Sequence, residues 1–152
     1  MNSKTNKAAK ATADALARVL ADSHMLYMKA HNFHWNVEGP HFFALHEMFE
    51  AQYTDIAGAM DEIAERIRAL GEYAPGSSAE FAALARVTEV EGRLAAADMV
   101  RETAADYDII GETIAGAIAV AEEHGDDISA GMLADRLAFH QKQGWMMKAW
   151  LK

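Results

Sequence analysis

The sequence predicts an all-α protein, a bundle of four long helices with one short extra helix between the second and the third. Three observations lead to this prediction. The 152 residues are 51% hydrophobic and include only two prolines, a composition that favours helices over many short strands. Apolar residues recur every three or four positions over long stretches, which is the spacing of one buried helix face. Glycine and proline fall between these stretches, where they end helices.

The first long helix is expected from about residue 12 to residue 37. Its buried face is predicted by a stripe of apolar and small residues: Leu16, Val19, Leu20, Ser23, Leu26, Ala30 and Phe33. Gly39 and Pro40 follow, and a tight corner is expected here because glycine suits the position after a helix and proline the first turn of the next. The second helix then runs antiparallel to the first, from about residue 41 to residue 70, and Gly71 ends it.

Two capping-box patterns mark the next two helices. Ser77 with Glu80 is expected to open a short helix that ends near residue 86, and Thr88 with Glu91 to open the third long helix. In such a box, two side chains satisfy backbone N–H groups at the start of the helix. The third long helix is expected to end near residue 123.

The fourth long helix is expected after Gly125, with Asp126 and Asp127 as caps, and it runs to the C-terminus. Residues 12–152 then form a single domain, long enough to bury roughly two-thirds of its unfolded surface. Residues 1–11 are expected to be a flexible basic arm, because they lack apolar periodicity and carry no acid but three lysines: Lys4, Lys7 and Lys10.

Composition limits the functions that the chain can have. There is no cysteine, so a metal would be held by nitrogen and oxygen atoms, and the seven histidines become the residues of interest. A net charge of −9 argues against a general nucleic-acid-binding surface and suits a protein that attracts cations. No apolar signal segment and no run of about 18 apolar residues occurs. We therefore expect a cytoplasmic protein that does not cross a membrane.

Metal-ligating side chains are spaced four residues apart on the expected second helix. His46 and Glu50 form one such pair, and Asp61 and Glu65 form another. Residues four apart are neighbours on a helix, so each pair can place two ligands on one metal ion. The pairs share one flank of the helix, away from its apolar stripe. His34, near the end of the first helix, could reach His46 as a further ligand.

The two pairs are too far apart to bind the same ion within one chain. Their separation of 15 residues corresponds to roughly 22 Å along a helix. If two copies of the helix pack antiparallel about a two-fold axis, His46 and Glu50 of one copy face the acids of the other, and this happens twice. Small residues on the same flank, Ala57, Gly58 and Ala64, would allow the close approach. Two imidazoles with carboxylates favour Fe(II), with Mn, Zn or Co as competitors.

An iron site inside one bundle is not favoured, because it needs Glu-x-x-His on two of the helices and a glutamate on each of the others. The long helices of this chain lack that arrangement.

The stretches HNFHWNVEGPHFFALHEMFEAQY and DEIAERI, between His31 and Ile67, resemble the signature of Dps, the mini-ferritins also called DNA-binding proteins from starved cells. The resemblance implies a ferritin-like bundle, a dodecameric shell, oxidation of Fe(II) preferentially by hydrogen peroxide, storage of ferric mineral and protection of DNA. It also implies a set of ferroxidase ligands, the last two supplied across the dimer interface: His34, His46, Glu50, Asp61 and Glu65. Position 50 is often Asp in relatives.

The same resemblance implies roles for residues around the site. Trp35 corresponds to a tryptophan beside the iron site that can take up oxidising equivalents, and Trp145 is a second candidate. Acidic pores through which iron enters such shells lie near the start of the last helix, so the candidates are Asp126, Asp127 and Asp135.

Other readings remain open. His24, His124 and His140 are expected to be structural, and His31 is intermediate because no acid is paired with it. The N-terminal lysines, Lys4, Lys7 and Lys10, could coat DNA, since twelve arms on one shell would act together. The chain could also be a plain helical interaction module without enzymatic activity, in which case it would be a monomer or simple dimer.

Overall fold

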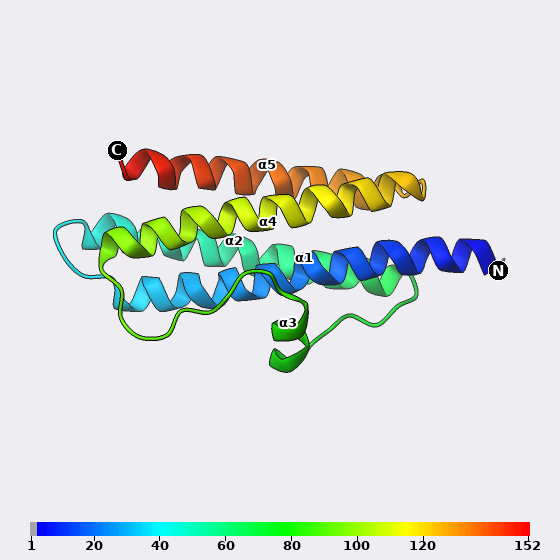
Figure 1. The fold of residues 1–152 in the computed structure, drawn as a ribbon, viewed down its shortest axis with the longest axis horizontal. Coiled ribbons are helices and arrows are strands. Elements are labelled where there is room, and N and C mark those ends of the chain that lie inside the picture. Colours follow the sequence, from blue (N-terminus) through cyan, green and yellow to red (C-terminus); the bar gives the residue numbers. More distant parts are fainter. Residues whose placement is uncertain (1–2) are drawn as a thin grey trace.

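The computed structural model describes the backbone of residues 3–152 and the side chains from residue 6 onward. It confirms the all-α class and the four-helix bundle with a short extra helix. The helices are α1 (Ser3–Asn36), α2 (Phe42–Ala69), α3 (Ser78–Leu84), α4 (Ala96–Glu123) and α5 (Asp127–Trp150). The four long helices lie side by side, and α3 lies against α1 in the connection from α2 to α4 (Figure 1).

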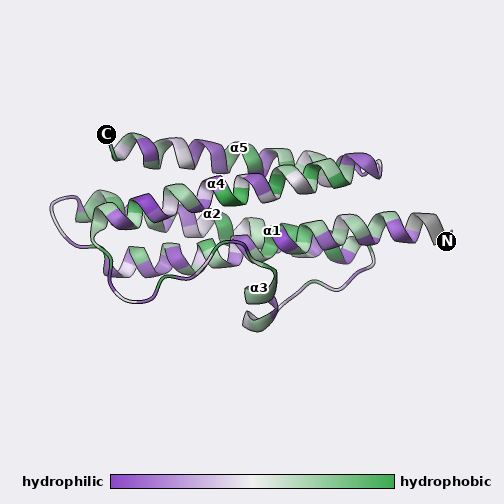
Figure 2. Ribbon diagram, viewed as in Figure 1, coloured by the Kyte–Doolittle hydropathy of each residue, from purple (hydrophilic) through white to green (hydrophobic). Residues whose placement is uncertain are grey.

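The buried faces of the four long helices build one hydrophobic core. Hydrophobic (green) and hydrophilic (purple) segments alternate along the long helices (Figure 2). Every residue of the stripe expected on the first helix is buried. The largest fully buried side chains come from all four long helices: Leu16, Phe33, Leu45, Phe49, Ile56, Ile63, Ile67, Met99, Ile110, Ile114, Leu133 and Met147. Among residues 3–152, no helix is long and apolar enough to span a membrane.

A tight corner joins α1 to α2 as expected. Gly39 has a φ of +108°, which side chains rarely tolerate, and Pro40 follows it. The N–H of Phe42 donates to the carbonyl of Gly39 over 3.0 Å. The corner therefore places the end of α1 beside the start of α2, at the same end of the bundle as the C-terminus (Figure 1).

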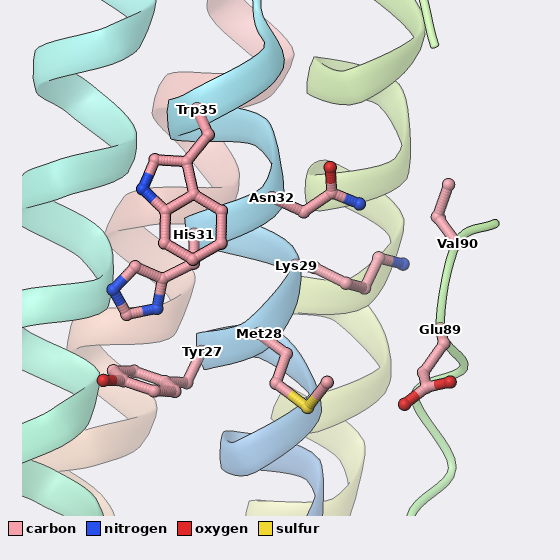
Figure 3. A pocket seen from close by; sticks show the side chains of 8 residues that line it. All are labelled: Tyr27, Met28, Lys29, His31, Asn32, Trp35, Glu89 and Val90. Atoms are coloured by element: carbon pink, nitrogen blue, oxygen red, sulfur yellow. The ribbon is translucent and has the colours of Figure 1, made fainter. Parts of the chain in front are cut away.

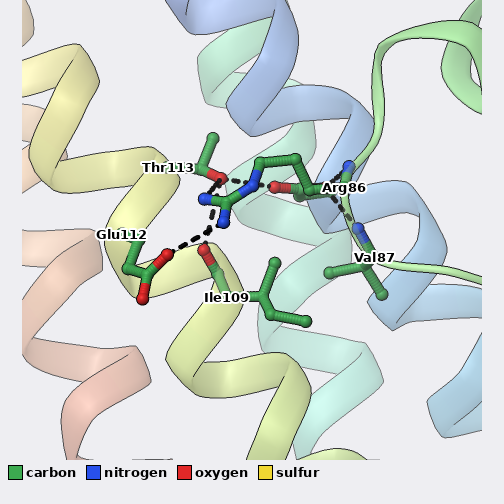
Figure 4. Close-up of polar contacts among 6 residues, drawn as sticks. Arg86, Val87, Ile109, Glu112 and Thr113 are labelled. Atoms are coloured by element: carbon green, nitrogen blue, oxygen red, sulfur yellow. Dashed lines mark hydrogen bonds and ion pairs between the residues drawn. The ribbon is translucent and has the colours of Figure 1, made fainter.

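The expected start of the third long helix was wrong, because α4 begins at Ala96 rather than at Thr88. The buried carboxylate of Asp22 on α1 accepts hydrogen bonds from the backbone N–H groups of Arg86 and Val87 over 2.6 and 2.9 Å (Figure 4). These bonds hold the segment extended along the bundle. Gly92 then adopts a φ of +81°, which a right-handed helix cannot accommodate.

The first helix starts earlier than expected, because α1 includes the part of the basic arm from Ser3 onward. Three alanines fall in this stretch, Ala8, Ala9 and Ala11, and alanine has the highest helix propensity. Lys10 also pairs with Asp14 one turn later, over 2.8 Å, a spacing that supports helices. Residues 1 and 2 and the side chain of Lys4 lie outside what the structure describes, so the expected arm is described only in part.

A buried ion pair joins α1 to α4 inside the bundle. The Lys29 ammonium lies 2.5 Å from the Asp106 carboxylate and 3.2 Å from Glu102, and the side chains of Lys29 and Asp106 are 4% and 6% exposed. Burial raises the pKa of Asp106 to about 6 although Lys29 opposes the shift. The carboxyl group of Asp106 therefore binds its proton more tightly in the folded protein than in the unfolded protein. Its ionisation lowers the free energy of unfolding as pH rises from about 4 to about 6.

Replacing Lys29 with methionine should lower the free energy of unfolding by roughly 3–5 kcal/mol, because the Asp106 carboxylate would be left buried without its cation. Denaturant unfolding at about pH 8 and a fixed protein concentration measures the change. The loss should shrink at about pH 5, where a proton can neutralise the carboxylate. The double variant Lys29→Met with Asp106→Leu should recover most of the stability, since no buried charge remains. Equal midpoints for the single variant and the parent protein would contradict this account of the pair.

Candidate metal centre

Three side chains with metal-binding atoms come together at the corner between α1 and α2. His34 lies in the last turns of α1, and His46 and Glu50 lie one turn apart near the start of α2. One ligand atom from each residue lies within 4.8 Å of the others. Within residues 3–152, this is the one group of three or more histidines and acids that converges in this way. We call these three residues the histidine half-site.

Reciprocal hydrogen bonds hold the two imidazole rings. Nδ1 of His34 donates to the backbone carbonyl of His46 over 2.8 Å, and Nδ1 of His46 donates to the backbone carbonyl of His34 over 2.7 Å. A carbonyl oxygen can only accept, so each Nδ1 carries its ring's hydrogen. The lone pair of each ring is therefore on Nε2. This is the usual outer-shell arrangement that orients a metal-ligating histidine.

Stacking further restricts these rings. The His34 and His46 rings are stacked with centroids 3.7 Å apart and planes 17° apart. Phe42 stacks on His46 at 5.0 Å and 29°. His34 is only 8% exposed, His46 is half-buried and Glu50 is exposed. Two fixed nitrogen donors thus lie next to one carboxylate that faces outward.

The histidine half-site is a suitable but incomplete site for a divalent transition metal ion. Two imidazoles and one carboxylate, with positions left open, are the ligand set of many Fe(II) sites, and Zn²⁺, Mn²⁺ and Co²⁺ accept the same donor types. A two-iron oxidation centre needs more carboxylates than Glu50 alone. The described part of the chain brings no further acid or histidine to this group.

Asp61 and Glu65 do not join the histidine half-site within the chain. Both lie on α2, are exposed, and belong to no converging group of ligands. The 15 residues between the His46–Glu50 pair and the Asp61–Glu65 pair correspond to roughly 22 Å of helix. The structure therefore agrees with the sequence that one subunit cannot bring all five residues around one site.

Tyr53 is a neighbour of the half-site that the sequence analysis did not single out. Its ring meets the His34 ring edge-on, with centroids 5.3 Å apart and planes 81° apart. It also stacks on His31 at 3.8 Å and 22°. Its position seven residues after His46 puts it on the same helix flank, so the helical spacing used for the ligands could have identified it.

Trp35 does not stack on either histidine of the half-site. It is 69% exposed, and its ring stacks on His31 at 5.1 Å and 30° (Figure 3). Tyr53 is the tyrosine whose ring meets the His34 ring of the half-site. Trp145, the second candidate, lies on α5 and is 66% exposed.

The three candidate pore residues differ in their contacts and in their exposure to solvent. Asp126 caps α5 by accepting from the N–H of Ser129 over 3.0 Å, and it also binds Arg66 over 2.8 Å. Burial alone would raise the pKa of Asp126, but the hydrogen bonds from Ser129 and the Arg66 guanidinium lower it overall. Asp127 and Asp135 are exposed. Asp127 and Asp135 therefore have solvent-exposed carboxylates. The carboxylate of Asp126 is already used in the helix cap and in the ion pair with Arg66.

The remaining candidates lie outside the half-site. His140 is 1% exposed, and burial lowers its pKa to about 3, so it is a neutral ring within the bundle. His24 stacks on Phe81 at 4.3 Å, and His124 is the exposed residue that ends α4. Of the lysines proposed to contact DNA, Lys7 is exposed and Lys10 pairs with an acid.

Known proteins resemble this chain over nearly its whole length. The family model described as the ferritin-like domain matches residues 13–152. The DNA protection during starvation protein of Brevibacillus brevis is 41% identical over 138 residues, which are 90% of this chain and 92% of that protein. The crystal structure of a Dps protein from Bacillus brevis has a TM-score of 0.94 at 36% identity and covers 100% of both chains.

A third relative connects the fold to metal chemistry. The crystal structure of the DPS protein from Vibrio cholerae O1 is described as that of a member of a broad superfamily of ferritin-like diiron-carboxylate proteins. It has a TM-score of 0.93 at 29% identity and covers 97% of this chain and 92% of that one. Fold, coverage and identity agree, and the chain therefore belongs to the ferritin-like family and, within it, to the Dps proteins.

Proposed function

We propose that this protein is a ferroxidase that oxidises Fe(II), its substrate, with hydrogen peroxide and stores the ferric product inside a dodecameric shell. The observation that carries the proposal is the histidine half-site, with two oriented imidazole nitrogens beside the outward-facing carboxylate of Glu50. This activity takes place in the cytoplasm. It protects DNA by removing both reactants that would otherwise form damaging radicals.

The oxidation site is completed by a second subunit. Antiparallel packing of two α2 helices places His46 opposite the partner subunit's Glu65, and Glu50 opposite the partner subunit's Asp61. Both pairs share one two-fold axis between residues 55 and 56, so each dimer carries two identical sites. Gly58 lies beside that axis, is exposed, and has no atom within 4 Å of where a Cβ would stand. Its missing side chain favours the close contact of the two helices.

The residues have distinct tasks in the proposed reaction. The Nε2 atoms of His34 and His46 and the carboxylates of Glu50, Asp61 and Glu65 bind two Fe(II) ions. Each ion gives one electron to peroxide, which takes up two protons and leaves as two water molecules, so no radical is released. The net charge of −9 raises the local concentration of Fe(II). Zn²⁺, Mn²⁺ and Co²⁺ should compete for the same nitrogen and oxygen atoms.

Removing either half of the site should abolish catalysis. The variant with His34→Ala and His46→Ala, and the variant with Asp61→Asn and Glu65→Gln, should each oxidise Fe(II) no faster than the same amount of Fe(II) and peroxide in buffer. Ferric absorbance after mixing measures the rate. His124→Ala, which changes an exposed histidine outside the half-site, is the matched control and should keep the parent rate. A normal rate in the double-histidine variant would contradict the proposal.

Mixing the two inactive variants tests whether subunits share the site. In a mixed dimer, the intact histidine half-site of one subunit meets the intact acids of the other. Random co-assembly after unfolding and refolding should therefore restore about one quarter of the parent sites. A site built within a single chain would stay inactive in the mixture. Light scattering on the same samples gives the mass of the assembly, and a monomer or simple dimer would favour a plain helical interaction module.

DNA coating through the N-terminal lysines is a separate function. Lys10 forms an ion pair with Asp14. Of the arm lysines whose side chains the structure describes, this leaves Lys7, which is exposed, to contact DNA. The net charge of the chain is −9. We expect no retardation of DNA on gels at physiological salt, because few phosphate contacts give weak, salt-sensitive binding. Retardation that disappears when residues 1–10 are removed would show that the arms coat DNA after all.

A further inference from the structure

Three rings are stacked at the start of α2. The Phe42 ring lies against the His46 ring, with centroids 5.0 Å apart and planes 29° apart. The His34 ring lies against the same imidazole at 3.7 Å and 17°. Among the described residues, Phe42 and His34 make no ring contact with each other. Phe42 and His34 therefore cover opposite faces of the His46 ring.

The two imidazoles of the histidine half-site are held unequally. His34 is only 8% exposed, and Tyr53 meets its ring edge-on as well. His46 is half-buried, and its described ring contacts are those with His34 and Phe42. The face of His46 that His34 does not reach is thus covered by Phe42.

Phe42 is itself fixed by the corner between α1 and α2. It is the first residue of α2, and its N–H donates to the carbonyl of Gly39 over 3.0 Å. Four residues separate it from His46, so the two side chains are neighbours on the helix. The first turn of α2 has no side-chain cap, because His41 makes no capping hydrogen bond, and helix ends fray. The stack therefore links an uncapped turn to the first ligand of α2.

We propose that Phe42 is a positioning residue of the histidine half-site. Its ring confines the His46 imidazole to the orientation in which Nδ1 donates to the carbonyl of His34 and Nε2 stays available to a metal ion. Phe42 has no metal-binding atom, so it acts through His46. The inference rests on the proposed function in that both need a divalent metal ion at the half-site. It concerns how tightly that ion is bound.

The expected effect follows from the freedom of a histidine ring. The torsion that turns the ring has broad energy wells, so the orientation must come from contacts. Without the Phe42 ring, the His46 imidazole can turn outward, and metal binding must then order it again. Groups that orient a ligand typically contribute about 10- to 100-fold to metal affinity. We expect roughly tenfold here, because the bond from Nδ1 of His46 to the carbonyl of His34 remains.

Titration with Co²⁺, followed by its visible absorption, tests the proposal. The background protein carries Asp61→Asn and Glu65→Gln, which remove the acids that a partner subunit would supply, so the titration reports the histidine half-site alone. Phe42→Leu keeps an apolar side chain but lacks the flat face of the ring. It should bind Co²⁺ roughly tenfold more weakly than the background protein. Phe42→Met is a second variant with the same expected loss.

Two matched variants separate this role from a general loosening of the corner. Phe42→Tyr keeps the flat ring, and because Phe42 is 42% exposed, the added hydroxyl can reach solvent. Phe43→Leu changes a neighbour that is 70% exposed. Both should bind Co²⁺ with the affinity of the background protein. Equal affinity in Phe42→Leu would overturn the inference. A loss in either matched variant as large as that in Phe42→Leu would overturn it as well.

Iron oxidation with the acids intact gives a second readout. Phe42→Leu should reach the parent rate at saturating Fe(II) but need roughly tenfold more Fe(II) for half of that rate. A variant that only lost active protein would instead show a lower maximal rate at an unchanged half-saturating concentration. If the background protein itself binds no Co²⁺, the metal site and the proposed function both fail. If it binds Co²⁺ and Phe42→Leu binds equally well, the role of Phe42 alone fails.

Discussion

The reciprocal hydrogen bonds between His34 and His46 are the contacts on which both the corner and the candidate site depend. The last carbonyl groups of α1 have no partners within the helix, and the carbonyl of His34 gains one from the His46 ring. The His34 ring returns a bond to the carbonyl of His46. These two bonds fasten the end of α1 to the start of α2, and they also leave both Nε2 atoms free. The fold and the ligand geometry are therefore set by the same atoms.

The interior of the bundle explains why metal chemistry would lie on its flank. Between α1 and α4, the buried carboxylate of Asp106 is already paired with the Lys29 ammonium. Between α2 and α5, Gln52 donates to Gln143 over 3.3 Å, so amides stand where a metal site inside the bundle would need carboxylates and histidines. A buried cation also repels a metal ion. The available ligands lie instead where α1 and α2 meet the outside, and there a single chain offers only three.

Sequence reasoning worked where the relevant contacts are local. Helical spacing was enough to identify the buried stripes and to pair His46 with Glu50, because neighbours on a helix are four residues apart. It failed at the start of α4, since the bonds that keep residues 86 and 87 out of a helix come from Asp22, more than 60 residues earlier in the chain. The place of Trp35 beside the proposed iron site came from the family resemblance and stays a prediction; within one chain its ring stacks on His31. Tyr53, from α2, is the side chain that helical spacing could have added to this neighbourhood, since its ring meets His34 edge-on.

If the oxidation site is divided between two subunits, the oxidation of Fe(II) depends on formation of the dimer. The histidine half-site is formed within one chain, since its rings are held by that chain's own backbone, so a free subunit could bind one Fe(II). It could not hold two, because Asp61 and Glu65 lie roughly 22 Å along α2 from the half-site. Peroxide would then meet a lone Fe(II), the case that releases radicals. The division of the proposed ligands would therefore make two-iron oxidation depend on assembly of the dimer.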